Sequence, residues 1–267
     1  MREIRGREAA LAVLNDPRFV VPPVPPVPPA AAGIGWLRAT VGRFATGEDH
    51  RRRRALAATI IASLTLTPAS AGKPAPASAG EWAQMSAGER VQVSAGERVQ
   101  VSAGERVQVS AGERVQVSAG DEHPVDVLAR AMGIDGPVSD VVRDIAQAYQ
   151  PGTGDAARAD EAVERLIVRL GGAHDEATAA HIGVLVQACD ATATLRQRTR
   201  DRPLDEVLRD DPPVRATKRQ ATEAVTIDGE RFEAGEVVLV PLAGDLAFGA
   251  GPRRCPGEEL ALALARA

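Results

Sequence analysis

The sequence has few of the large side chains from which most protein cores are built. Its 267 residues include two Trp, one Tyr and four Phe, although 44% of the residues are hydrophobic. A core must therefore be built mainly from Ala, Val and Leu, which bury less apolar area per residue. The composition is nevertheless that of a globular protein, and the length suits one domain or at most two.

An excess of one charge, a disulfide pattern and a long apolar run are also missing. The formal net charge is -4 at pH 7, so bulk electrostatics gives no reason to expect binding to nucleic acid or to an anionic membrane. The two cysteines, Cys189 and Cys255, have neither a zinc-binding spacing nor the pattern of a disulfide-rich secreted protein. The start of the chain has no apolar signal core, and the most apolar stretch, 55–66, is too short and too rich in Thr and Ser to span a bilayer. We therefore expect a cytoplasmic protein.

An octapeptide repeat separates two parts that have helical patterns. SAGERVQV occurs four times without change within residues 86–117, and degenerate copies flank it. In a helix the valines would spiral around the axis, whereas in an extended chain they would all lie on one side. The repeat predicts an inserted array without chemistry, poorly ordered or variably folded; a binding surface or a small β-layer is the alternative. The chain thus divides into 1–69, 70–120 and 121–267.

The first part combines short helices with a proline-rich connector. Residues 7–14 predict a short helix, and no strand is expected before it. Residues 20–29, VVPPVPPVPP, predict polyproline II, as a stiff connector or as a docking peptide. A second helical stretch at 36–66 carries His50 and the arginine run 51–54, which alone is typical of a solvated face.

The third part is predicted to be helical up to a short β region. One helical segment, ATAAHIGVLVQACDATATL, is apolar along its length and predicts a buried central helix, with Asp175 and Glu176 suited to its N-terminus. Two strand-like runs follow, with turns at Gly229 and Gly235. The other helical segments are PVDVLARAMGI, VSDVVRDIAQAY, ADEAVERLIVRL and LDEVLRD.

The densest motif is FGAGPRRCPGEELALALA, which begins at Phe248. It presents Cys255 in a glycine-rich loop directly before a helix. Backbone N–H groups and the positive helix end would lower the pKa of this thiol and direct a thiolate at a metal or an electrophile. A buried, inert cysteine is the alternative, but the glycines indicate close approach of the backbone to a ligand.

This motif resembles the haem-binding loop of the cytochrome P450 haem-thiolate monooxygenases, F-x-x-G-x-R-x-C-x-G. Phe248, Gly251, Arg253, Cys255 and Gly257 occupy every fixed position. The resemblance implies that Cys255 is the axial ligand of the iron of haem b, and that Arg253 pairs with a haem propionate. It also implies the mainly α cytochrome P450 fold with a small β portion, in reduced form and carrying the repeat as an insertion.

Two further matches precede the loop in the order that the family has. Glu206 and Arg209 form an E-x-x-R motif followed by Pro-Pro-Val. Alone this is a common surface ion pair, but in this order it resembles the family's structural support for the haem site. Arg219 lies where family members have another propionate-binding arginine; a solvated arginine is the alternative.

His50 and Arg54 are similar to the family's H-x-x-x-R on the helix that crosses the haem. Their spacing puts both side chains on one helix face. The resemblance implies that both bind propionates, whereas alone they would be read as surface charge.

The apolar helix resembles the family's oxygen-binding helix, where an acid is followed at once by a threonine. Here Ala191 separates Asp190 from Thr192. We expect Thr192 to relay protons, with Asp190 serving beside it. A Thr192 hydroxyl bonded back to its own helix is the alternative, and Cys189 is expected to be a small core residue.

The matching segments are abridged. Little chain separates Thr192 from Glu206, and the stretch that normally carries N-R-D-P before the haem loop is missing. The helices over the substrate pocket would have to come from roughly residues 124–170. These gaps weaken the scaffold that the motifs require.

The resemblance implies a monooxygenase that inserts one atom of dioxygen into a small organic substrate and releases the other as water. The implied electron donors are a soluble ferredoxin and its ferredoxin reductase. The abridged scaffold favours a second hypothesis, a non-catalytic or vestigial haem-binding protein. A third is an interaction protein organised by the repeat array.

Overall fold

Helices make up most of the structure. The computed structural model describes residues 1–26, 28, 32–66, 91–92, 98–99, 115–117 and 122–266. The mainly α class with a small β portion is confirmed. The helices in this part of the chain are α1 (Arg7–Asn15), α2 (Gly33–Thr40), α3 (Gly47–Ser63), α4 (Pro124–Ala131), α5 (Ser139–Gln147), α6 (Ala156–Arg169), α7 (Glu176–Arg198), α8 (Leu204–Asp210) and α9 (Glu258–Arg266).

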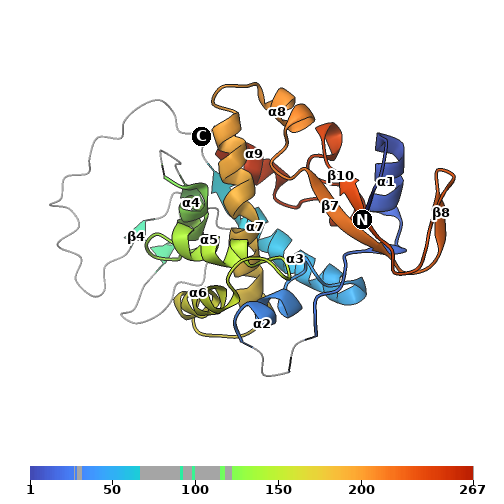
Figure 1. The fold of residues 1–267 in the computed structure, drawn as a ribbon. Helices are drawn as coiled ribbons and strands as arrows, with labels where there is room; N and C mark the ends of the chain where they lie inside the picture. The colour runs from blue at the N-terminus through green and yellow to red at the C-terminus, as the bar shows by residue number, and fades with distance from the viewer. Residues whose placement is uncertain are drawn as a thin grey trace.

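Helix α7 is the central element of the helical part (Figure 1). Helices α4, α5 and α6 pack on one side of it, and α3 and α9 also contact it. The core between these helices consists mainly of Val, Leu, Ile and Ala, as the composition predicts. Asp175 accepts a hydrogen bond from the Thr178 N–H at 2.7 Å, so the predicted helix start is confirmed. No described helix is both long and apolar enough to cross a membrane.

A four-stranded sheet lies on the other side of α7. Its order is β1-β10-β7-β2, with β1 parallel to β10 and the other neighbours antiparallel. The described strands are β1 (Arg2–Glu3), β2 (Phe19–Val20), β3 (Leu64–Leu66), β4 (Val91–Gln92), β5 (Arg98–Val99), β6 (Val115–Val117), β7 (Ala216–Ala221), β8 (Val225–Ile227), β9 (Glu230–Phe232) and β10 (Val237–Pro241).

The expectation of no strand before Arg7 is wrong. Arg2 lies opposite Val238 and Glu3 opposite Leu239 in β10. Two residues are too few to produce an alternating pattern, and their strand conformation depends on the edge that β10 offers.

The sheet and α1 enclose a second, smaller core. Phe19 and Phe232 meet edge to face, with ring centroids 5.6 Å apart. The β8–β9 hairpin turns at Asp228 and Gly229, both with positive φ. This is the arrangement of a type I′ turn, so the predicted turn at Gly229 is confirmed.

Three short strands fall inside the predicted insertion at 70–120. In β4 and β5, Val91 lies opposite Val99, which is the equivalent position in the next copy of the repeat. Strand β6 pairs in parallel with β3, and β3 is the strand that directly follows α3 in the chain. The rest of the array, like part of the proline-rich segment, lies outside the described residues, so its order remains a prediction.

Candidate functional site

The cysteine loop is held in place by its own backbone and by α1. The Cys255 N–H donates to the Phe248 carbonyl at 2.8 Å. Gly251 has φ +64°, and a Cβ there would lie 2.6 Å from Asn15 Oδ1 and 2.9 Å from the Leu14 carbonyl at the end of α1. Only glycine fits this approach, which accounts for one fixed position of the motif.

Helix α3 borders the same loop. A Cβ at Gly257 would lie 3.6 Å from Ile61 Cδ1 and 4.0 Å from Cys255 Sγ. The Arg54 guanidinium donates to the Arg254 carbonyl. The chain therefore brings together two motifs that are about two hundred residues apart in sequence.

Cys255 retains solvent access, yet its thiol pKa is raised. The main cause is burial of the sulfur among surrounding protein atoms, which disfavours the charged form. The Gly257 backbone and the charges of Arg54 and Arg254 act in the opposite direction. The predicted lowering of this pKa is therefore wrong for the protein by itself, because desolvation outweighs the helix N-terminus. Bound to a metal ion, a thiol loses its proton outright.

Four basic side chains from different elements gather near this loop: His50 and Arg54 on α3, Arg219 on β7 and Arg253 in the loop. We call them the cation group. Among the described residues, no carboxylate forms an ion pair with any of them. Arg219 is only 5% exposed. A buried arginine without a counter-charge is costly and calls for a ligand.

The electrostatics of the cation group reflect this lack of acid. Burial, followed by the charges of Arg253 and Arg43, lowers the pKa of Arg219 to about 10. Burial and the neighbouring arginines lower the pKa of Arg253 to about 10 as well. The pKa of His50 falls to about 4, mainly through burial and then through Arg253 and Arg54, so this imidazole is neutral at pH 7.

Backbone carbonyls and one hydroxyl orient Arg219 and Arg253. Arg219 donates to Thr217 Oγ1 and to the Lys218 carbonyl, each at 2.9 Å. Arg253 donates to the carbonyls of Arg43 and Ala45, between α2 and α3. Hydrogen bonds to neutral carbonyls orient a guanidinium but leave its positive charge uncompensated.

Arg54 differs from its neighbours in the arginine run. Each of the other three has at least one carboxylate partner: Arg51 with Glu48, Arg52 with Asp49 and Glu176, and Arg53 with Glu176. These three bind acids of α3 itself or of α7, and Arg54 is left for another anion. A solvated helix face therefore does not describe Arg54.

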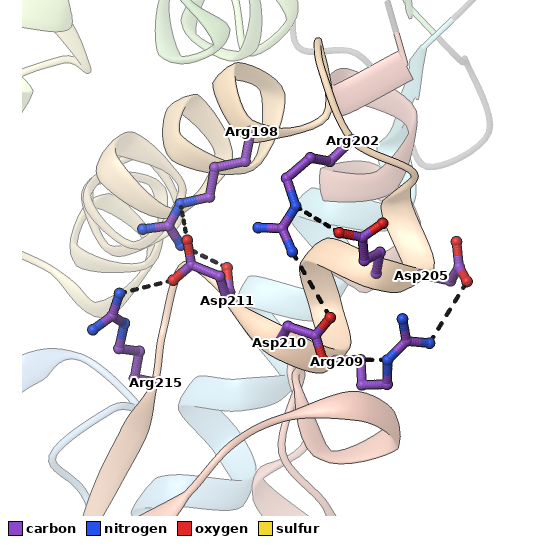
Figure 2. Close-up of polar contacts among 8 residues, drawn as sticks. Arg198, Arg202, Asp205, Arg209, Asp210, Asp211 and Arg215 are labelled. Atoms are coloured by element: carbon purple, nitrogen blue, oxygen red, sulfur yellow. Dashed lines mark hydrogen bonds and ion pairs between the residues drawn. The ribbon is translucent and has the colours of Figure 1, made fainter.

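Glu206 and Arg209 do not pair with each other. Glu206 accepts from Arg202 at 2.9 Å, and Arg209 contacts Asp210 and Asp205. Figure 2 shows Arg202 also pointing toward Asp210, within a network around α8. The members of this network are partly or fully exposed, and Glu206 and Arg209 belong to separate pairs, so their role in supporting the site stays a prediction.

Thr192 and Asp190 are not brought together either. Thr192 is 3% exposed, and Asp190 is exposed. Two residues apart on a helix, their side chains point about 160° apart, toward nearly opposite sides. Asp190 contacts Cys189, which is buried beside α4 and α5 as expected and has its pKa raised to about 12 by burial and then by Asp190. The acid–alcohol pairing has no geometric basis here.

The side of α7 that carries Asp190 also carries other residues. Gln187 and Asp190 are exposed, Ala191 and Thr194 are intermediate, and Gly183 on this side packs against Val41 before α3. No hydrogen bond from the Thr192 hydroxyl is found among the described residues. The helical period predicts which residues share this side of α7, because residues 187, 191 and 194 recur at helical spacing and residue 192 does not.

One further cation lies near the cation group and was not predicted from the sequence. Arg43, just after α2, has no ion pair among the described residues, and its charge acts on Arg219 and Arg253. Only the proximity of Gly42-Arg43-Phe44 to the H-x-x-x-R motif could have signalled it.

The residues present fit the haem that the resemblance implies. Haem carries two carboxylates, and the cation group offers uncompensated positive charge beside a cysteine with solvent access. No group of three or more His, Cys, Asp or Glu in the described part could hold a bare metal ion. A single cysteine ligand is consistent with an iron held by a macrocycle.

Comparisons with known proteins give the fold. No family model and no curated protein matches this sequence. Among solved structures, P450BioI in complex with acyl carrier protein ligated to hexadec-9Z-enoic acid has a TM-score of 0.56 and 18% identity, covering 98% of this chain and 82% of that chain. CalO2 has a TM-score of 0.55 and 16% identity, covering 96% and 78%. Ligand-free CYP164A2 of Mycobacterium smegmatis has a TM-score of 0.54 and 16% identity, covering 97% and 80%. The chain therefore has the cytochrome P450 fold.

Proposed function

We propose that this protein is a haem-thiolate monooxygenase with haem b as its cofactor. The observation that carries the proposal is the juxtaposition of Cys255 with a cation group that lacks acidic partners. A surface that only needed solubility would have no reason to bury Arg219 without a carboxylate. The cytochrome P450 fold adds the family context in which these residues bind haem.

Each residue of the site has one role in this proposal. Cys255 ligates the iron; Phe248, Gly251 and Gly257 shape the loop around it. Arg54, Arg219 and Arg253 neutralise the propionates, and His50, neutral at pH 7, donates a hydrogen bond to one of them. Glu206 and Arg209 belong to the α8 network that supports the site.

Bound haem would supply the activation of dioxygen, with two electrons and two protons used for each oxygen atom inserted and each water released. Asp190 is exposed on α7, two residues before Thr192, and can exchange protons with solvent. Thr192 remains the candidate for the relay that the sequence gives. Because Thr192 is buried on the side of α7 away from Asp190, α7 would have to change its conformation before the Thr192 hydroxyl could relay a proton. A ferredoxin and a ferredoxin reductase are the proposed electron donors, and the cytoplasm is the proposed location.

The test is the absorption spectrum of the purified, dithionite-reduced protein under carbon monoxide. We expect a Soret band shifted far to the red, the signature of a thiolate ligand, and its loss in Cys255→Ala. Cys189→Ala is the matched control, because Cys189 is buried in the helical core and should leave the band unchanged. A band typical of histidine-ligated haem, or no haem at all, would overturn the proposal.

A second function is favoured by one observation. Because Thr192 and Asp190 lie on opposite sides of α7, the chain would lack an assembled proton relay. A haem-binding protein without monooxygenase activity needs no relay. It would show the red-shifted band, but electrons supplied by a ferredoxin would yield peroxide rather than an oxygenated product.

A further inference from the structure

The segment between α2 and α3 lies against the cysteine loop. Arg253 donates one hydrogen bond to the Arg43 carbonyl at 3.3 Å and another to the Ala45 carbonyl. Phe44, between these residues, is buried against Tyr149 with ring centroids 5.2 Å apart. The backbone of this segment is therefore fixed by a buried aromatic residue on one side and by an arginine of the cation group on the other.

The Arg43 side chain projects from this fixed segment without an acidic partner. Its guanidinium carbon lies 5.9 Å from the centroid of the Phe44 ring, so the ring limits where the charge can lie. No ion pair of Arg43 occurs among the described residues, whereas three neighbouring arginines on α3 each have one. The positive charge of Arg43 reaches both Arg219 and Arg253, which lie on two other elements.

Three like charges from separate elements repel one another, and fold stability alone does not explain why they lie together. An anion that enters between them would remove this repulsion. We propose that Arg43 is a further cofactor-binding residue, which lies at the solvent side of the cation group and pairs with a haem carboxylate. This inference rests on the proposed function and adds a residue that no motif marks.

The exposure of Arg43 sets the size of its effect. Exposed charges are screened by salt and contribute little to binding, while buried ones contribute more. Loss of Arg43 should therefore speed haem dissociation about two- to fivefold, and this difference should shrink as the salt concentration rises. It should not move the absorption band of the iron–thiolate bond.

The experiment measures the rate of haem transfer from the loaded protein to an excess of a haem-scavenging apoprotein, at low and high salt. Arg43→Gln should release haem faster than the wild type at low salt, and Arg43→Lys should restore most of the difference. Arg165→Gln removes an exposed charge from α6 and is the matched control. Thermal unfolding of each haem-free variant verifies that the variant folds. With haem whose carboxylates are esterified, Arg43→Gln should match the wild type.

Each outcome decides the inference. Faster release that depends on salt and on free carboxylates supports it. Release at the wild-type rate, or an equal change with esterified haem, overturns it while the wild type still shows the thiolate band. If the wild type takes up no haem, the proposed function fails first and the inference fails with it.

Discussion

Two groups of arginines in this molecule differ in whether acidic side chains pair with them. Around α8, arginines meet acids: Figure 2 shows Arg198 and Arg215 converging on Asp211, and Arg209 reaching Asp205. In the cation group, Arg219 is more deeply buried than any of these, and no carboxylate among the described residues pairs with it.

From this difference we infer that the first group serves the fold and that the second serves a ligand. The α8 pairs are satisfied by the protein alone, and exposed pairs of this kind contribute little to stability. The cation group is left uncompensated where desolvation is most costly, which makes sense only if another negative charge completes it. The strongest tests of this comparison change one group and ask whether stability and haem binding respond in opposite directions.

The largest effect is expected for Arg219→Gln. Removing an unpaired buried charge should raise the stability of the haem-free protein by about 1 kcal/mol, since no ion pair is lost. The same change should weaken haem binding about 30-fold or more, because a carboxylate of haem loses its buried partner. Chemical denaturation of the haem-free protein and haem titration measure the two effects. A variant that is destabilised and binds haem normally would contradict the comparison.

His50 should make the stability of the haem-free protein depend on pH. Its folded pKa is about 4, against an ordinary value of 6.5. Between these values the unfolded chain binds more protons, so stability is lost as the pH falls from 6.5 to 4. Because the ring is half exposed, we expect a loss of about 1 kcal/mol rather than the full value of the shift. The free energy of unfolding, measured in urea at several pH values, should lose this pH dependence in His50→Gln. If it falls with pH in the variant as it does in the wild type, His50 is not the group that titrates.

Glu176→Gln removes the carboxylate that Arg52 and Arg53 share, and Arg52 keeps Asp49 as a partner. Arg52 and Arg53 lower the pKa of Glu176 to about 2, so its contribution is present above about pH 4.5 and is lost as the pH falls toward 2. We expect a destabilisation of about 0.5–1 kcal/mol at pH 7, with no difference from the wild type near pH 2. Glu48→Gln, which removes only the partner of Arg51, is the control and should cost less. A loss that persists at pH 2 would mean that packing is responsible.

The smallest effect is expected for Arg209→Gln. Its contacts with Asp205 and Asp210 are exposed, and the loss should be below about 0.5 kcal/mol. Thermal unfolding of this variant beside Asp210→Asn measures it. A large loss, or failure to fold, would show that the E-x-x-R arginine supports the site through contacts other than those seen here.

The helical fold was predictable because its elements carry long periodic patterns. The apolar stretch that became α7, with Asp175 at its start, is such a case. Strand β1 was not predictable, because two residues are too few to show an alternating pattern and their conformation depends on pairing with β10. Strand β7, which carries Arg219, was also missed, since alternation in a half-buried polar strand is weak.

The site was predictable where a motif fixes backbone geometry. Gly251 could be found because only glycine fits beside Asn15. The raised pKa of Cys255 could not be predicted, because the burial of its sulfur depends on residues far away in sequence. Arg43 belongs to no motif, and the pairing of Thr192 with Asp190 was expected from residue type, whereas the helical period places the two residues on different sides of α7.

The central proposal is that the cation group binds the carboxylates of haem. The most direct test is the affinity of the haem-free wild type for haem compared with haem whose two carboxylates are esterified. We expect the esterified form to bind at least about tenfold more weakly, as the loss of charge-assisted contacts requires. Equal affinity for the two forms would contradict it.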